Sequence, residues 1–99
     1  MTSRTMHITN NYGESVRVEV FNEGTLFTDD ITVDNNDTRS LEIIVEVYGI
    51  VNYGNCELKV IVYKIGEDTP KQQQTIQPGK NEVNVIIKKG NTSPIILVE

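Results

Sequence analysis

The segment of residues 39–65 constrains the fold of this chain more than any other stretch. It contains two strand-like runs, RSLEIIVEVY and CELKVIVYKI, joined by the turn-rich connector GIVNYGN. Aliphatic side chains occupy alternate positions of each run, and a period of two places them on one face of a strand. We expect the two runs to form a central hairpin whose inward residues belong to the core of a β-sandwich. Those residues are Leu41, Ile43, Val45, Val47, Cys56, Leu58, Val60 and Val62.

The rest of the chain shows the same alternation between turn signals rich in Asn, Gly and Pro. Further short strands are predicted at residues 5–9, 15–21, 28–33, 75–77, 82–89 and 94–99. The short connection between the first two favours a hairpin, the acidic residues inside the third favour an edge position, and residues 66–74 have the composition of an exposed loop. Strands at about 8–12-residue spacing without helical periodicity indicate an all-β fold. We predict one domain over residues 1–99, a seven- or eight-stranded antiparallel β-sandwich of Ig-like or jelly-roll type.

Composition and charge exclude several functional classes. The 99 residues carry a net charge of −5, with both signs spread along the chain, which argues against nucleic acid as a partner. No segment approaches the roughly 20 apolar residues of a membrane-spanning helix. The opening MTSRTMHIT lacks the apolar region of a secretory signal. A cell-surface or extracellular assembly, or a virion, is nevertheless the location that we favour.

Few residues are able to carry chemistry. His7 is the only histidine, and no motif pairs it with a nucleophile or an orienting acid. Cys56 is the only cysteine, which excludes an internal disulfide and multi-cysteine metal sites. Because Cys56 is in phase with its aliphatic neighbours, we interpret it as a small buried hydrophobe. A cross-link to a neighbouring subunit and a reactive thiol are the alternatives, and we expect neither enzymatic activity nor a cofactor.

The most polar loop, residues 34–38, is the candidate for a ligand site. Asp34, Asn36 and Asp37 offer the oxygen ligands that calcium prefers, but their spacing does not match an EF-hand. Because Asn and Asp tolerate tight turns, we interpret the loop as structural and keep calcium as the alternative. Aromatic residues near the central hairpin could line a glycan platform, although packing is the interpretation that we favour. These residues are Tyr48, Tyr53 and Tyr63.

Apolar residues on the outward faces of the predicted strands are the most informative feature. A sandwich strand with a solvated outer face normally carries polar residues there. The central runs instead carry Ile44, Tyr48, Ile61, Tyr63 and Ile65, and the final strand is apolar on both faces, at Ile95, Ile96, Leu97 and Val98. We predict that these residues contact a partner. Cover by residues 66–74, or a small closed barrel, are the alternatives.

Residues 40–65 also carry a family likeness. With the SLEI strand, the glycine-bearing connector and the run GNCELKVIVY, they resemble the late part of the sandwich domain in bacterial endospore appendage subunits. The resemblance implies a self-assembling fibre subunit whose sheets augment one another and whose cysteines cross-link neighbours. This chain departs from that family because Cys56 is alone and no cysteine-bearing N-terminal connector is present. Phage head-decoration or tail domains of similar size would present the same pattern.

These observations lead to one functional prediction and one alternative. We predict a non-enzymatic structural subunit that self-assembles through β-sheet edges and an apolar face into a fibre or virion-like array. Its partners are copies of itself. The alternative is a small ligand-binding module that uses the loop of residues 29–37 with calcium, or nearby tyrosines with a glycan.

Overall fold

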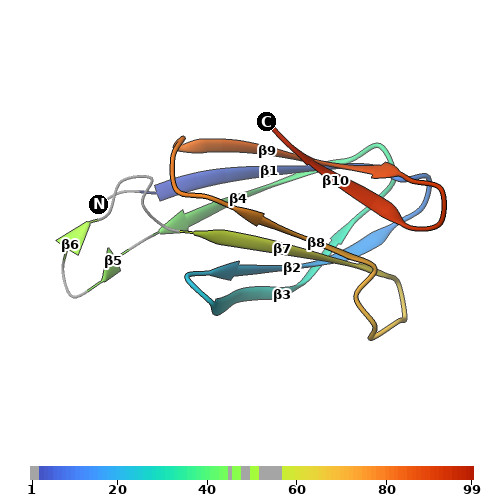
Figure 1. Ribbon diagram of the computed structural model, residues 1–99, viewed down its shortest axis with the longest axis horizontal. Coiled ribbons are helices and arrows are strands. Elements are labelled where there is room, and N and C mark those ends of the chain that lie inside the picture. Colours follow the sequence, from blue (N-terminus) through green and yellow to red (C-terminus); the bar gives the residue numbers. More distant parts are fainter. Residues whose placement is uncertain (1–2, 45, 48–49, 52–56) are drawn as a thin grey trace.

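Two four-stranded β-sheets pack face to face in this protein (Figure 1). The computed structural model describes residues 3–44, 46–47, 50–51 and 57–99. Sheet A has the strand order β10-β9-β1-β4, and sheet B has the order β3-β2-β7-β8. The strand bounds are β1 (Ser3–Asn11), β2 (Val16–Asn22), β3 (Thr25–Val33), β4 (Thr38–Ile44), β7 (Leu58–Lys64), β8 (Gln72–Ile76), β9 (Glu82–Lys89) and β10 (Pro94–Val98). The predicted all-β sandwich is confirmed, whereas its Ig-like or jelly-roll type stays a prediction.

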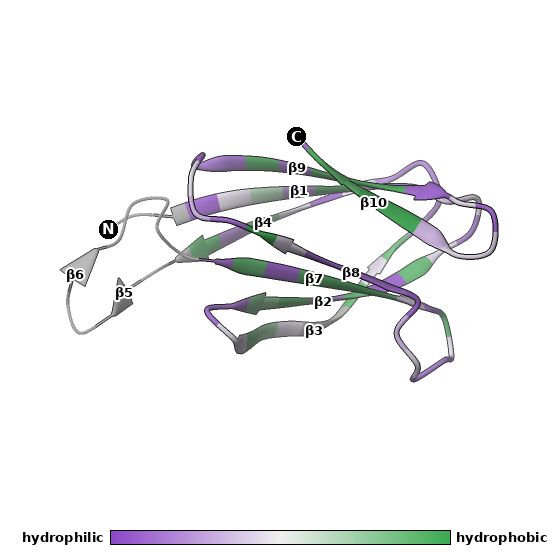
Figure 2. Ribbon diagram, in the orientation of Figure 1, coloured by the Kyte–Doolittle hydropathy of each residue, from purple (hydrophilic) through white to green (hydrophobic). Residues whose placement is uncertain are grey.

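The core lies between the two sheets and follows from the alternation along each strand. Figure 2 shows hydrophobic and hydrophilic segments alternating along β7 and β9. Full burial of one aliphatic side chain contributes about 1.5–3 kcal/mol, so a cluster of this kind supplies most of the driving force. The cluster consists of Met6, Ile8, Val16, Val18, Val20, Ile31, Val33, Ile43, Leu58, Val60, Val62, Ile76, Val83, Val85 and Ile87, with Tyr12, Leu41 and Ile96 packed against it. Among the predicted core residues, the side chains of Val45, Val47 and Cys56 lie outside the described residues.

The predicted central hairpin is wrong, because its two strands belong to different sheets. β4 is an edge strand of sheet A, and β7 is an inner strand of sheet B. The connector between them contains two short paired strands, β5 (Glu46–Val47) and β6 (Ile50–Val51). The predicted hairpin of the first two strands is also wrong, since β1 lies in sheet A and β2 in sheet B. A period of two determines which face of a strand is buried, but it does not determine the neighbouring strand.

Sheet A is mixed, so the predicted purely antiparallel pairing is wrong for one pair of strands. β1 pairs with β4 in antiparallel register and with β9 in parallel register. The parallel register aligns Met6 with Val83 and Ile8 with Val85, which keeps all four side chains on the buried face. Parallel neighbours need a long crossover connection, and here the whole of sheet B lies between β1 and β9 in the sequence.

One edge strand of sheet B, β3, was predicted from the sequence, whereas most of the other, β8, was not. β3 carries Asp29 and Asp30 and lies at one edge, as predicted. β8 lies at the other edge and begins within the stretch predicted to be a loop, since Gln72, Gln73 and Gln74 pair with β7. Backbone pairing alone holds these glutamines in the strand, and glutamine side chains give no apolar alternation by which to predict it.

Gly90, in the turn between β9 and β10, provides a test of this arrangement. A Cβ atom added there would lie 2.3 Å from the carbonyl oxygen of Ser93, which accepts a hydrogen bond from the Gly90 N–H. We expect Gly90→Ala to lower the free energy of unfolding by about 1–3 kcal/mol, because the turn must shift. Gly79→Ala is the matched control, since a Cβ there meets nothing within 4 Å. Urea unfolding measures both, and equal losses would contradict the prediction.

Candidate functional site

Two of the residues predicted to contact a partner lie on the outer face of sheet B and are nevertheless buried there. Ile61 and Tyr63, on β7, are only 8% and 7% exposed. The guanidinium carbon of Arg17, on neighbouring β2, lies 4.0 Å from the centre of the Tyr63 ring. The Tyr63 hydroxyl donates a hydrogen bond to Glu19 Oε1, and Arg17 and Glu19 approach to 3.8 Å. Side chains of β2 therefore cover Tyr63 within the chain.

The hydrogen bond between Tyr63 and Glu19 predicts a pH dependence of stability. That bond raises the pKa of the Tyr63 hydroxyl above its ordinary value of 10.0, and burial and the charge of Glu19 raise it further. Because the folded protein holds this proton more tightly than the unfolded chain, the contribution is fully present below about pH 10 and is lost as pH rises through the raised pKa. We expect the free energy of unfolding to fall in that range, and to fall less in Tyr63→Phe. Identical alkaline profiles of the two proteins would contradict this account.

The other members of the predicted outward patch are Ile44, Tyr48 and Ile65. Ile44 closes β4 in the opposite sheet, and Tyr48 lies outside the described residues. Ile65 follows β7 and is 53% exposed. Of the three tyrosines considered for a glycan platform, Tyr48 and Tyr53 lie outside the described residues, and Tyr63 is 7% exposed.

Most of the β10 side chains that were predicted to contact a partner are exposed. Ile95 and Leu97 are each 41% exposed and Val98 is 40% exposed, whereas Ile96 packs against the core. The register places Ile95 opposite Lys88 and Leu97 opposite half-buried Ile86 on β9. β10 is an edge strand of sheet A. An apolar strip therefore runs along an edge strand that pairs only with β9 in the part of the chain that the structure describes.

The loop of residues 34–38 uses its polar groups within the fold. Asp34 Oδ1 accepts a hydrogen bond from Ser15 Oγ at 2.8 Å, and Asp37 Oδ1 accepts one from the Thr38 N–H at 2.9 Å. Asn36 has a φ of 65°, the left-handed conformation that asparagine tolerates in turns. No cluster of three or more His, Cys, Asp or Glu side chains that could hold a metal occurs among the described residues. These contacts support the structural interpretation of the loop.

Asn10 organises the same loop, and the sequence reasoning missed it. The side chain is fully buried and donates to the carbonyl oxygens of Glu14 and Val33, each at 2.8 Å. Its Oδ1 accepts from the Tyr12 N–H, and its main chain bonds to residues 36 and 37. Through these hydrogen bonds, Asn10 links the connection between β1 and β2 with the connection between β3 and β4. Its position in phase with the buried residues of β1 was the available signal.

His7 has polar partners that the sequence could not reveal. Its Nδ1 lies 2.7 Å from Ser40 Oγ, and its Nε2 lies 3.4 Å from Glu82 Oε1. β4 and β9 flank β1 and bring these three side chains into a row on the outer face of sheet A. The row has the character of ordinary cross-strand polar contacts.

Of these arrangements, the β10 strip is the one that exposes apolar side chains to the solvent at a sheet edge. By contrast, hydrogen-bond partners within the chain are present for Tyr63, for Asp34 in the loop of residues 34–38, and for His7. None of the described residues forms a helix that could cross a membrane. No family model matches this chain, and neither a curated protein nor a solved structure matches it.

Proposed function

We propose that this protein is a non-enzymatic structural subunit that self-assembles through β-sheet edges and an apolar face into a fibre or virion-like array. The observation that carries the proposal is the edge strand β10, whose Ile95, Leu97 and Val98 side chains are about two-fifths exposed. Such a strand is a template for pairing with another chain.

The four edge strands of the two sheets differ in how they are protected. On one flank the edge strand β4 carries the charged residues Arg39 and Glu42, and the edge strand β3 lies beside it. On the other flank β8 and β10 approach each other, and neither contains a charged residue. Charges on an edge oppose strand addition, because pairing would bury them without partners. The flank of β8 and β10 is therefore the favoured site of contact between subunits.

The apolar side chains of β10 supply a driving force as well as an accessible edge. In Figure 2 β10 is hydrophobic over most of its length. Burying the exposed part of each of Ile95, Leu97 and Val98 would contribute about 1 kcal/mol, in addition to the main-chain hydrogen bonds of an added strand. Ile65, which is also exposed, is a second contact candidate from the sequence. The resemblance of residues 40–65 to appendage subunits agrees in kind with such an assembly.

Size-exclusion chromatography with light scattering, followed by negative-stain microscopy, tests the proposal. We expect a mass above the 11.1 kDa of one chain that rises with concentration, because association through a shared surface follows mass action. Regular particles or filaments should be visible in the large fractions. A monodisperse species of one chain at the highest soluble concentration, with no particles in the images, would refute the proposal.

A further inference from the structure

Main-chain hydrogen bonds between β9 and β10 determine how β10 can accept another strand. Asn84 on β9 exchanges two such bonds with Glu99, the residue after β10: the Glu99 N–H donates at 2.8 Å and the Asn84 N–H donates at 3.1 Å. At the other end of the hairpin, the Gly90 N–H donates to the Ser93 carbonyl oxygen at 3.0 Å. The two residues that flank β10, Ser93 and Glu99, therefore direct main-chain groups to β9.

The residues of β10 between them follow the alternation of an antiparallel pair, in which every second residue is hydrogen-bonded to its neighbour. Ile95 and Leu97 direct their main-chain groups to β9, and Ile96 and Val98 therefore direct theirs to the opposite side. β9 is the only strand paired with β10 in the part of the chain that the structure describes. Pro94, the first residue of β10, has a carbonyl group but no N–H. An added strand can thus accept from the N–H groups of residues 96 and 98.

One antiparallel register of two β10 strands uses both of these N–H groups in each strand. When Ile96 lies opposite Ile96 of a second chain, the two residues exchange two hydrogen bonds. Each Val98 N–H then donates to the Pro94 carbonyl oxygen of the other chain, and the missing N–H of Pro94 leaves out one bond per strand. The two chains are related by a twofold axis that passes between the two Ile96 residues, perpendicular to the sheet.

The same register joins the exposed apolar side chains of the two chains. A twofold axis perpendicular to the sheet keeps the outer faces of both A sheets on the same side. Ile95 of each chain, which is 41% exposed, then lies opposite Leu97 of the other, which is also 41% exposed. A register centred on Leu97 would instead place the Glu99 carboxylate opposite the apolar side chain of Ile95. Parallel pairing would turn one sheet over and leave the two apolar strips on opposite faces.

Charged groups of the β9–β10 hairpin also favour the antiparallel orientation. The end at the β9–β10 turn carries the ammonium groups of Lys88 and Lys89. The opposite end carries the carboxylates of Glu82 and Glu99 and the ammonium group of Lys80, and all five residues are exposed. Antiparallel pairing brings the acidic end of each hairpin to the basic end of the other, whereas parallel pairing brings like charges together.

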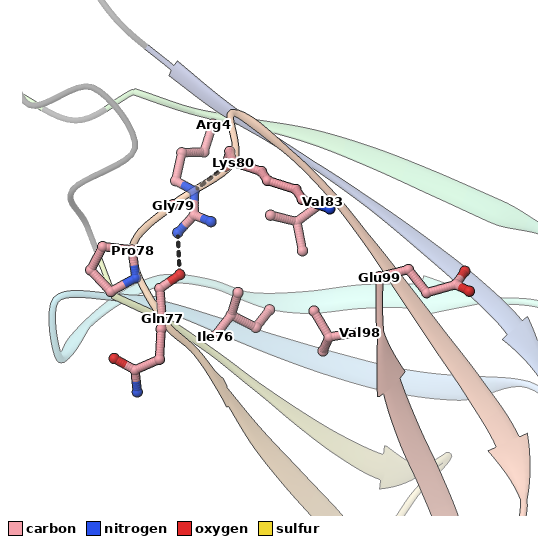
Figure 3. A pocket seen from close by; sticks show the side chains of 9 residues that line it. All are labelled: Arg4, Ile76, Gln77, Pro78, Gly79, Lys80, Val83, Val98 and Glu99. Carbon is pink, nitrogen blue, oxygen red and sulfur yellow. Dashed lines mark hydrogen bonds between the residues drawn. The ribbon is translucent and has the colours of Figure 1, made fainter.

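Figure 3 shows the acidic end of the hairpin from close by. Glu99 follows Val98, and both line a pocket of about 290 Å³ together with Val83 and residues 76–80. The Glu99 carboxylate points away from Arg4 in this view, and Glu99 is exposed. The carboxylate is therefore accessible to a second chain that approaches β10.

We propose that two copies of this chain pair through β10, antiparallel about a twofold axis at Ile96, so that their four-stranded A sheets join into one continuous sheet. The inference rests on the assembly through β10 proposed above, and it specifies the partner strand, the direction and the register. Because this contact uses the same surface on both copies, it closes on itself and yields a dimer. Larger assemblies are then built from this dimer.

Glu99→Lys tests the charge complementarity without altering the apolar strip. We expect it to weaken dimerisation several-fold at low ionic strength, because it brings like charges to Lys88 and Lys89 of the partner. Glu42→Lys makes the same change of charge on β4, at the opposite edge of sheet A, and should leave dimerisation unchanged. Analytical ultracentrifugation measures both, and equal weakening in the two variants would contradict the antiparallel orientation.

Disulfide trapping tests the register itself. Ile95→Cys and Leu97→Cys are oxidised alone and as an equimolar mixture, and mass spectrometry of the digested dimers identifies the joined positions, so that Cys56 stays in place. Opposed residues of a non-hydrogen-bonded antiparallel pair have Cα atoms about 4.5 Å apart, a separation that a disulfide can bridge. We expect the mixture to give a disulfide between positions 95 and 97, at least about tenfold more abundant than links formed at these positions by either variant alone.

The other arrangements give different disulfides. A link between two copies of position 97 alone would indicate a register centred on Leu97, and links of both variants to themselves would indicate parallel pairing; either result would overturn the inference. Light scattering of the same samples separates it from the proposed assembly. A mass above one chain without the disulfide between positions 95 and 97 would overturn the inference alone. That disulfide, in a species that stays at twice the mass of one chain at every concentration, would support the dimer and refute the array.

Discussion

Replacing Asn10 with aspartate is expected to lower the free energy of unfolding by at least about 3 kcal/mol. The two side chains have nearly the same size, so packing is preserved. The Asn10 amide group donates to the carbonyl oxygens of Glu14 and Val33, and an aspartate would place an acceptor against both. The buried carbonyl group of Val33 and the partly buried one of Glu14 would lose their donors.

Chemical unfolding of the wild type, Asn10→Asp and Asn84→Asp measures this effect. Asn84 is the control because it lies on β9 with an exposed side chain. A domain of this size has a total stability of about 5–15 kcal/mol, so Asn10→Asp should leave the protein near the limit of folding. Asn10→Ala should also be strongly destabilised, since it removes the donors without adding repulsion. A loss in Asn10→Asp as small as that in Asn84→Asp would contradict the structural role of this residue.

Leu97→Lys is expected to abolish the concentration-dependent association of this protein. Leu97 is 41% exposed on β10, beside half-buried Ile86 of β9. A contact that covers this strip would bury the new ammonium group without a partner, at a cost of several kcal/mol. The corresponding weakening of association is at least about a hundredfold. In the monomer the change should be nearly neutral, because the position is exposed.

Leu26→Lys is the matched control for Leu97→Lys. Leu26 is 45% exposed and lies on β3, at the opposite edge of the sandwich. Light scattering of the three proteins at equal concentration compares them, and circular dichroism checks that all are folded. Loss of association in Leu26→Lys, with Leu97→Lys unaffected, would move the contact surface from β10 to β3.

Strand positions and buried faces were predictable from the sequence because alternation encodes them directly. Leu58, Val60 and Val62 are in the core, as their spacing predicted. The exposed apolar strip of β10 was visible in the same way, since β10 is apolar on both faces. The inward polar residues of β1, Arg4 and Asn10, were not predicted, because both lie just outside the strand predicted at residues 5–9.

Strand partners could not be predicted in this way, because alternation carries no information about neighbours or direction. β4 and β7 are similar runs joined by a turn-rich connector, yet they lie in different sheets. The His7 contacts depend on Ser40 and Glu82, which are 33 and 75 residues away in the sequence. The cover of Tyr63 depends on the register that places Arg17 opposite it. Each of these contacts follows from pairing over long sequence separations.

Amide hydrogen exchange at low and high protein concentration tests the central proposal, assembly through the flank of β10, most directly. Because β10 is an edge strand paired only with β9 among the described residues, its outward N–H groups should exchange quickly in the monomer. Our account predicts that exchange in residues 95–98 slows at high concentration, while exchange in β3 is unchanged. Equal exchange of residues 95–98 at both concentrations, or protection that appears at β3 instead, would contradict it.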